Sequence, residues 1–315
     1  SPRARKALSA LGISAGAGKG TNVWLACGLL AFEESCGIVL TQDCDVVSFR
    51  RDNIVRLCFA AIHPELQYRF AKLYYSRVSD RLYGRVSRLF LAPFLEALVR
   101  VIGHQPLIEF LRSFRYPLAG ECVMRREAAA ALQMEPGWGL EMRLLCEAFR
   151  HIEPRFIAQV DGGRFYEHRH QALGDAGSGL FRMSKEIAQT LFANLIDEGF
   201  PVCAQFMDAL RESFSREVAE ALRRSRHLAL MNGLHGGEDD EKAAAALTGA
   251  FDAAESEFMT GFGSGENVLP AWSQLFRRDP RGVQRLFKAL VPGPRGSTSS
   301  TRSRPAVSRG QERLV

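Results

Sequence analysis

Two aspartates one residue apart, Asp43 and Asp45, follow the β-branched run 38–41 in the segment IVLTQDCDVVSF. Aspartate is unfavourable in strands, and two neighbouring carboxylates repel each other. One interpretation is a turn, because Asp accepts backbone hydrogen bonds where a strand ends. The other is a cation site, since Mg²⁺ and Mn²⁺ prefer carboxylate oxygens as ligands. The segment alone leaves both interpretations open.

A glycine-rich stretch, GISAGAGKGTNVW, lies further upstream. It is not a P-loop, because position 13 is Ile where that motif needs Gly, and Lys19 is followed by Gly20 instead of Ser or Thr. Gly-Lys-Gly at the start of a helix still offers backbone N–H groups and one cation to a phosphate. A plain glycine-rich entry into a helix explains the stretch equally well.

A second candidate anion site is YGRVSRLFLAPFLEAL, where Gly84, Arg85 and Ser87 precede a strongly apolar helical pattern. Exposed N–H groups, the helix dipole, a guanidinium and a hydroxyl suit a small anion. The alternative is structural: Gly84 and Ser87 cap the helix, and Arg85 is solvated.

Two further segments carry chemistry-bearing side chains. In EPGWGLEMRLLCEAF, Trp138 lies in a glycine loop suited to cover a ligand, and Glu141 opens a helix, where an acid is favourable for the dipole alone. In FYEHRHQAL, His168 and His170 project to the same side near a strand end. One such histidine is usually structural, whereas two can supply a metal ligand and an acceptor contact.

The elements that must position these residues alternate in type. Strand-like runs at 37–42, 66–75 and 156–165 are separated by helical patterns, which indicates α/β layering. These helical patterns cover 21–34, 86–102, 107–114, 125–132 and 140–149. From about residue 180 only helices are expected, at 180–195, 202–230, 238–260 and 270–290.

The pattern therefore predicts an α/β domain over 1–200 and a helical C-terminal extension over 201–291. The segment 292–315 is rich in Pro, Gly, Ser and Arg and has few large apolar residues. Such a composition cannot bury enough surface to offset its ordering entropy, which predicts a disordered basic tail.

Charge and cysteine content restrict the class of protein. The formal charge is +6, but 292–315 holds five arginines against one glutamate, so no basic folded face and no nucleic-acid partner are expected. The seven cysteines are irregularly spaced, without a C-x-x-C pair or a signal peptide, which predicts a cytoplasmic location. No apolar stretch reaches the ~18 residues of a membrane span, so no membrane partner is expected.

Taken together, the order and spacing of these motifs resemble the glucosyl-3-phosphoglycerate synthases, retaining glycosyltransferases of the Rossmann-like GT-A fold (family GT81). The resemblance rests on Asp-x-Asp at 43–45, Gly-Arg-Val-Ser at 84–87, PLAGE at 117–121, PGWGLE at 136–141 and EHRH at 167–170. It also includes Gly-Lys-Gly at 18–20 and runs from about Gly16 to Gln189. The helical C-terminal region resembles the extension of the longer family members.

The resemblance implies transfer of glucose from UDP-glucose, or another NDP-glucose, to the 2-hydroxyl of 3-phosphoglycerate with retention of configuration. It also implies a homodimer and a role for each candidate residue. Asp45 and His168 are expected to bind Mg²⁺ or Mn²⁺, and the donor is expected to contact Lys19, Asp43 and Trp138. The acceptor is expected to contact Gly84, Arg85, Ser87 and His170. Glu141 is expected to lie beside the reacting sugar as a positioning or catalytic residue. Ser87 replaces the family's Thr, Trp138 its Tyr, and His170 its Asn.

One departure concerns length. Only 42 residues precede Asp43, whereas two or three β–α units of ~30 residues each are needed before the metal motif of this fold. The GT-A core is therefore expected to be N-terminally incomplete.

Several alternatives remain open at this point. One is a related transferase with another donor or acceptor, such as a mannosyl-3-phosphoglycerate or glucosylglycerate synthase. A polyprenyl-phosphate sugar transferase would need a membrane-seeking segment. The others are a truncated, non-catalytic remnant that binds a sugar nucleotide, and a nucleic-acid binder that works through the basic tail.

Overall fold

The structure of the protein, a computed structural model, describes residues 2–14, 16, 18–163, 172–175, 177–234, 238–261 and 268–291. The predicted site residues His168 and His170 lie outside these residues, and so does the predicted tail 292–315.

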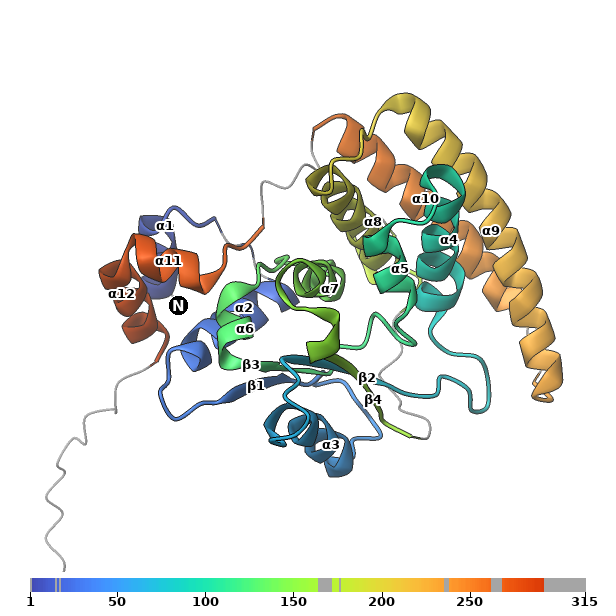
Figure 1. Ribbon diagram of the computed structural model, residues 1–315. Coiled ribbons are helices and arrows are strands. Elements are labelled where there is room, and N and C mark those ends of the chain that lie inside the picture. The colour runs from blue at the N-terminus through green and yellow to red at the C-terminus, as the bar shows by residue number, and fades with distance from the viewer. Residues whose placement is uncertain are drawn as a thin grey trace, which may run out of the picture.

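A four-stranded sheet lies at the centre of the described structure (Figure 1). Its order is β1 (Ile38–Thr41), β3 (Cys122–Arg125), β2 (Phe70–Tyr74) and β4 (Ile157–Asp161). Strand β3 is antiparallel to both of its neighbours, and β2 is parallel to β4. The sequence predicted three of these strands and missed β3, whose sequence CVMR has a single β-branched residue, whereas the equally short β1 reads IVLT and has three.

Helices cover both faces of the sheet. Helix α3 (Arg51–Ile62) packs on one face, and α2 (Lys19–Ala31), α6 (Arg126–Ala131) and α7 (Leu140–His151) lie on the other (Figure 1). Successive strand side chains point to opposite faces. Val123 accordingly belongs to the small apolar cluster under α3, whereas Met124 belongs to the large core on the other side.

Helix α3 was not predicted from the sequence. Its outward face carries Val55, Phe59 and Ile62, all more than half exposed, so its sequence does not read as one apolar and one polar side.

A helical bundle stands beside the sheet (Figure 1). It contains the π-helical turn η1 (Ser87–Leu91) with α4 (Ala92–Ile102), then α5 (Pro106–Arg112), α8 (Gly179–Asp197), α9 (Ala204–Met231) and α10 (Glu238–Met259). Its centre is a cluster of buried aromatic rings contributed by Phe90, Phe94, Phe192, Phe214 and Phe251. The predicted helices at 86–102, 107–114, 180–195, 202–230 and 238–260 are all present, although η1 and α4 divide the first of them.

The two ends of the described chain pack together. Helix α1 (Pro2–Ala10) contacts α12 (Pro280–Leu290), and Trp272 of α11 (Trp272–Arg278) stacks on Trp24 of α2 at 4.2 Å between ring centroids. Each indole N–H donates to a carbonyl, Trp272 to Trp24 and Trp24 to Pro270. The helix predicted over 270–290 is thus two helices, separated at Asp279, whose side chain caps α12.

None of the helices in the described part of the chain combines the length and the apolar character needed to cross a membrane.

Candidate functional site

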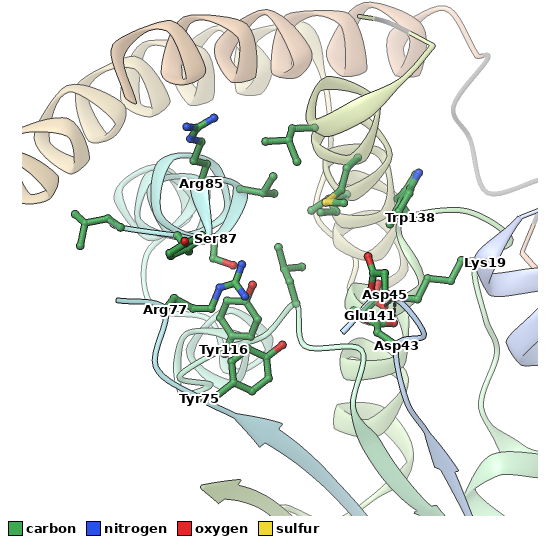
Figure 2. A pocket seen from close by; sticks show the side chains of 18 of the residues that line it. Lys19, Asp43, Asp45, Tyr75, Arg77, Arg85, Ser87, Tyr116, Trp138 and Glu141 are labelled. Carbon is green, nitrogen blue, oxygen red and sulfur yellow. Dashed lines mark ion pairs between the residues drawn. The ribbon is translucent and has the colours of Figure 1, made fainter. Parts of the chain in front are cut away.

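A cavity of about 280 Å³ opens between the sheet and the bundle. Every predicted site residue that the structure describes lines this cavity: Lys19, Asp43, Asp45, Gly84, Arg85, Ser87, Trp138 and Glu141. Figure 2 shows these residues except Gly84. The acidic residues lie with Lys19 on one side, and Arg85 and Ser87 lie on the other. Segments more than 100 residues apart in the sequence therefore converge on one site.

The acidic side is organised around Lys19, the first residue of α2. Its ammonium nitrogen lies 2.7 Å from Oδ1 of Asp43, which follows β1, and 2.7 Å from Oε1 of Glu141 in the first turn of α7. Burial alone would lower the pKa of Lys19, but the carboxylates of Glu141 and Asp43 outweigh it and raise the pKa well above its ordinary value. Lys19 is therefore charged throughout the physiological range.

The glycines around Lys19 have a packing role. A Cβ on Gly20 would overlap the carbonyl oxygen of Glu135, and one on Gly18 would overlap that of Pro136. The backbone N–H of Thr21 donates to the Pro136 carbonyl at 3.2 Å. Gly-Lys-Gly thus lets α2 approach the loop before α7, which neither of the interpretations of this stretch anticipated, and it brings Lys19 to Glu141.

Asp43 and Asp45 occupy the turn that follows β1, and both line the cavity. A Cβ on Gly120, just before β3, would overlap the Asp43 carboxyl group. The two interpretations of this segment are therefore compatible: the acids form a turn, and the turn presents them to the cavity.

The basic side begins at Gly84, whose φ of +72° lies in the left-handed region that favours glycine. Helical structure starts at Arg85, so Gly84 ends the preceding loop, whereas Ser87, the other residue of the capping interpretation, lies inside the helical stretch, which has no side-chain cap. The guanidinium of Arg85 is only partly exposed and lies 3.6 Å from Asp239 and 3.9 Å from Asp240, both on α10. Arg85 is thus not simply solvated.

Three residues of this side were missed by the sequence analysis. The guanidinium of Arg77 lies over the rings of Tyr75 and Tyr116, 6.0 and 5.5 Å from their centroids, and all three residues line the cavity. Burial raises the pKa of Tyr116 and raises that of Tyr75 well above its usual value, so both phenols stay neutral. For Tyr75 and Arg77 the signal in the sequence is the density of Tyr and Arg in YYSRVSDRLYGR, which has no diagnostic spacing, and this segment does not include Tyr116.

The Trp138 loop is fixed to α8. The backbone N–H of Trp138 donates to Oε2 of Glu186 at 2.6 Å. A Cβ on Gly137 would overlap that same carboxyl group, and one on Gly139 would overlap the hydroxyl of Thr190. The glycine loop is therefore anchored by the helix behind it, with Trp138 at the cavity.

No three His, Cys, Asp or Glu residues within the described ranges gather closely enough to enclose a metal ion. The two aspartates at the cavity nevertheless offer carboxylate oxygens, the donor type that Mg²⁺ and Mn²⁺ prefer. The chemistry of the donors present is therefore consistent with a hard divalent cation at Asp45.

The cavity as a whole has two ends of opposite character. Carboxylates with one permanently charged lysine form one end, and arginines with phenol and serine hydroxyls form the other. Such a site can hold a cation-bound anion and a second, separate anion side by side.

No protein-family model matches the chain, but proteins of known function do. The glucosyl-3-phosphoglycerate synthase of Persephonella marina is 34% identical over 275 residues, which is 87% of this chain and 68% of that protein. The glucosyl-3-phosphoglycerate synthase of Methanococcoides burtonii is 28% identical over 285 residues, which is again 87% of this chain and 68% of that protein.

Among solved structures, glucosyl-3-phosphoglycerate synthase from Mycobacterium tuberculosis, in complex with Mn²⁺, UDP-glucose and phosphoglyceric acid, matches with a TM-score of 0.47 and 27% identity. The match covers 63% of this chain, which spans 60% of the length of that structure's chain. The relative at 34% identity confirms the family inferred from the motifs, and with it a GT-A type α/β core followed by a helical C-terminal part. The chain belongs to the glucosyl-3-phosphoglycerate synthase family.

Proposed function

We propose that this chain transfers glucose from UDP-glucose, or another NDP-glucose, to the 2-hydroxyl of 3-phosphoglycerate with retention of configuration. The observation that carries the proposal is that one cavity has both an acidic end and an arginine-lined end. The M. tuberculosis enzyme was solved with Mn²⁺, UDP-glucose and phosphoglyceric acid, and with Mg²⁺ and UDP. A further structure of that enzyme contains Mn²⁺, UDP and glucosyl-3-phosphoglycerate. These ligands match the two ends in charge.

The donor belongs at the acidic end. Asp45, together with His168, would hold Mg²⁺ or Mn²⁺. A divalent cation bound there neutralises the charge that the diphosphate gains as a leaving group. Asp43 and Trp138 would contact the donor, and Lys19 would place its permanent charge beside the diphosphate while holding both acids in position.

The acceptor belongs at the arginine end. Arg85, the Ser87 hydroxyl and the backbone at Gly84 would bind the acceptor's phosphate, and His170 would add a further contact. 3-Phosphoglycerate also carries a carboxylate. Arg77 gives this end a second guanidinium, so it can neutralise both anionic groups.

Glu141 would orient the reacting sugar and need not act as a conventional base. In a front-side mechanism with retention, the leaving phosphate oxygen takes the proton of the acceptor hydroxyl. Nζ of Lys19 lies 2.7 Å from Oε1 of Glu141 and holds the carboxylate in place. A carboxylate held in this way can accept a hydrogen bond from a sugar hydroxyl. Glu141→Gln should therefore reduce turnover much more than donor binding, and unchanged turnover would remove Glu141 from the site.

The test is UDP release from UDP-glucose with Mg²⁺, with and without 3-phosphoglycerate. Asp45→Asn runs in parallel, with Asp52→Asn, an exposed acid at the start of α3, as the matched control. Acceptor-dependent release that is lost only in Asp45→Asn supports the proposal. A wild-type chain that neither binds UDP nor releases it contradicts the proposal.

The same assay separates the alternatives. GDP-mannose replaces UDP-glucose in one arm, and D-glycerate replaces 3-phosphoglycerate in another. Turnover with glycerate but not with its phosphate would contradict the role given to Arg85.

Three expectations that concern the oligomeric state, the cellular location and the domain division stay predictions. Light scattering checks the homodimer, and cell fractionation checks the cytoplasmic location. We also propose the division into 1–200 and 201–291, with α9 and α10 forming one apolar core with α4 and α8. The two parts should accordingly unfold in one transition, which calorimetry checks.

A further inference from the structure

The PLAGE segment at 117–121 has no part in the proposed function so far. Its last residue, Glu121, directly precedes β3, and its side chain is fully buried. A buried carboxyl group is costly unless its oxygens accept hydrogen bonds. The partners of Glu121 come from both ends of the cavity.

The first carboxyl oxygen is bound to the donor end. Oε1 of Glu121 accepts from Nε2 of Gln42 at 2.9 Å and from the backbone N–H of Asp43 at 3.3 Å. These bonds fix the backbone where the chain leaves β1, one residue before Cys44 and two before Asp45. The direction in which the paired aspartates face the cavity therefore depends on Glu121.

The second carboxyl oxygen is bound to the acceptor end. Oε2 accepts from the hydroxyl of Tyr75 at 3.3 Å. The Tyr75 ring lies 5.0 Å from that of Tyr116, and the guanidinium of Arg77 lies over both rings. Glu121 thereby holds the wall against which Arg77 rests.

Glu121 is itself held rigidly by the sheet. Its carbonyl accepts from the N–H of Leu73 at 3.0 Å, and the preceding Gly120 carbonyl accepts from the Thr41 hydroxyl at 2.7 Å. The fully buried Lys72 donates to the carbonyl of Ala119 at 2.5 Å. Strands β1 and β2 thus clamp residues 119–121, so that Glu121 can serve as a fixed reference for both ends.

We propose that Glu121 is a positioning residue that sets the distance between the donor-binding turn and the acceptor-binding wall. The inference rests on the proposed function, because it concerns how two substrates are brought into register. Transfer requires the acceptor hydroxyl to meet the sugar carbon, and misplacement by about 1 Å costs about 100-fold in rate. Loss of the Glu121 side chain should therefore reduce turnover by a larger factor than it reduces the affinity for either substrate.

Two substitutions of Glu121 separate geometry from charge, and one of Tyr75 tests the acceptor side alone. Glu121→Gln keeps an oxygen that accepts from Gln42 and Asp43, and its amide can donate to the Tyr75 hydroxyl, which accepts as readily as it donates. Glu121→Ala leaves all three donors without this acceptor. Tyr75→Phe removes the acceptor-side bond to Oε2 of Glu121 and leaves the donor-side bonds from Gln42 and Asp43 in place.

The matched control is Glu217→Ala. Glu217 is about as buried, at 5% exposure, but it pairs with Arg100 between α9 and α4, away from the cavity. A purely structural role for Glu121 would give Glu121→Ala and Glu217→Ala the same pattern, with a lower Tm and little change in kcat.

The experiment measures kcat and KM for both substrates, the Kd of UDP with Mn²⁺ by calorimetry, and Tm. We expect Glu121→Ala to lose about 100-fold in kcat. Glu121→Gln should stay within about tenfold of wild type, the worth of one ordinary hydrogen bond. Tyr75→Phe should raise KM for 3-phosphoglycerate and leave the Kd of UDP unchanged.

Either of two results overturns the inference: a loss in kcat for Glu121→Ala no larger than for Glu217→Ala, or equal losses for Glu121→Ala and Glu121→Gln. A wild-type chain that binds neither UDP nor 3-phosphoglycerate would instead overturn the proposed function, and the inference with it. If the wild-type protein is active and Glu121→Ala has the same kcat, the inference about Glu121 is refuted and the proposed function stands.

Discussion

Nζ of Lys19 lies 2.7 Å from Oε1 of Glu141, although 121 residues separate them in the sequence. The same ammonium group lies 2.7 Å from Asp43. One cation therefore joins the turn that follows β1 to the first turn of α7. It keeps two acids of the donor end close together, where their like charges would otherwise repel.

Replacement of Lys19 by Gln removes this bridge. Because a charged hydrogen bond is worth about 1.5–3 kcal/mol, we expect kcat/KM for UDP-glucose to fall by about 10- to 100-fold. Steady-state UDP release measures the change. Lys185→Gln is the matched control, since Lys185 makes an ion pair of the same length, 2.7 Å, with Glu257 outside the cavity. Equal effects of the two substitutions would show that Lys19 acts only through stability.

The grouping of the motif residues could be predicted from the sequence, because each motif sits at the end of an element. Asp43 follows a strand, Lys19 and Glu141 begin helices, and Arg85 starts the apolar helix. The ends of layered elements meet at the edge of a sheet, so residues at such ends converge. Each motif was ambiguous by itself, and these positions were found because the order and spacing of the whole set resemble those of the family.

The remaining site residues depend on contacts that no local pattern encodes. Arg77 reaches the cavity because the loop after β2 folds back against Tyr116. Asp239 meets Arg85 only because α10 packs against η1. Strand β3 was missed for the same reason, since its sequence CVMR has only one β-branched residue and the strand is stabilised by pairing with β1 and β2 on its two sides.

Gly120 is expected to be essential for activity but not for folding. A Cβ at this position would overlap the Asp43 carboxyl group, so Gly120→Ala must displace that side chain. We expect a loss of at least about tenfold in kcat/KM, with Tm nearly unchanged, because the displaced atoms are the end of one side chain. Gly37→Ala, where a Cβ would meet nothing within 4 Å, serves as the control. Wild-type activity in Gly120→Ala would contradict the placement of Asp43.

Asp239 is expected to compete with the acceptor. It is an exposed acid 3.6 Å from Arg85, so a phosphate bound to Arg85 must replace it. Asp239→Asn should lower KM for 3-phosphoglycerate by about two- to fivefold at low ionic strength, the range of a surface ion pair. The difference should vanish in 1 M salt, where charges are screened within about 3 Å.

Asp208→Asn is the matched control for that measurement, because Asp208 is an exposed acid paired with Arg211 at 3.2 Å on α9. A higher KM for 3-phosphoglycerate in Asp239→Asn would mean that Asp239 aligns Arg85 for the acceptor instead of competing with it.

Thiol reagents should inactivate the protein through one cysteine. Cys44 is exposed and lies between Asp43 and Asp45, whereas burial raises the pKa of both Cys27 and Cys146 to about 12 and leaves those thiols protonated and inert. Modification of Cys44 by N-ethylmaleimide should therefore block the donor end, and UDP with Mn²⁺ should protect it. Cys44→Ser should keep activity and resist the reagent, while Cys203→Ser, which removes another exposed thiol, should remain sensitive. Mass spectrometry of the modified peptides identifies which cysteine has reacted.

Inactivation of Cys44→Ser at the wild-type rate would place the sensitive thiol elsewhere.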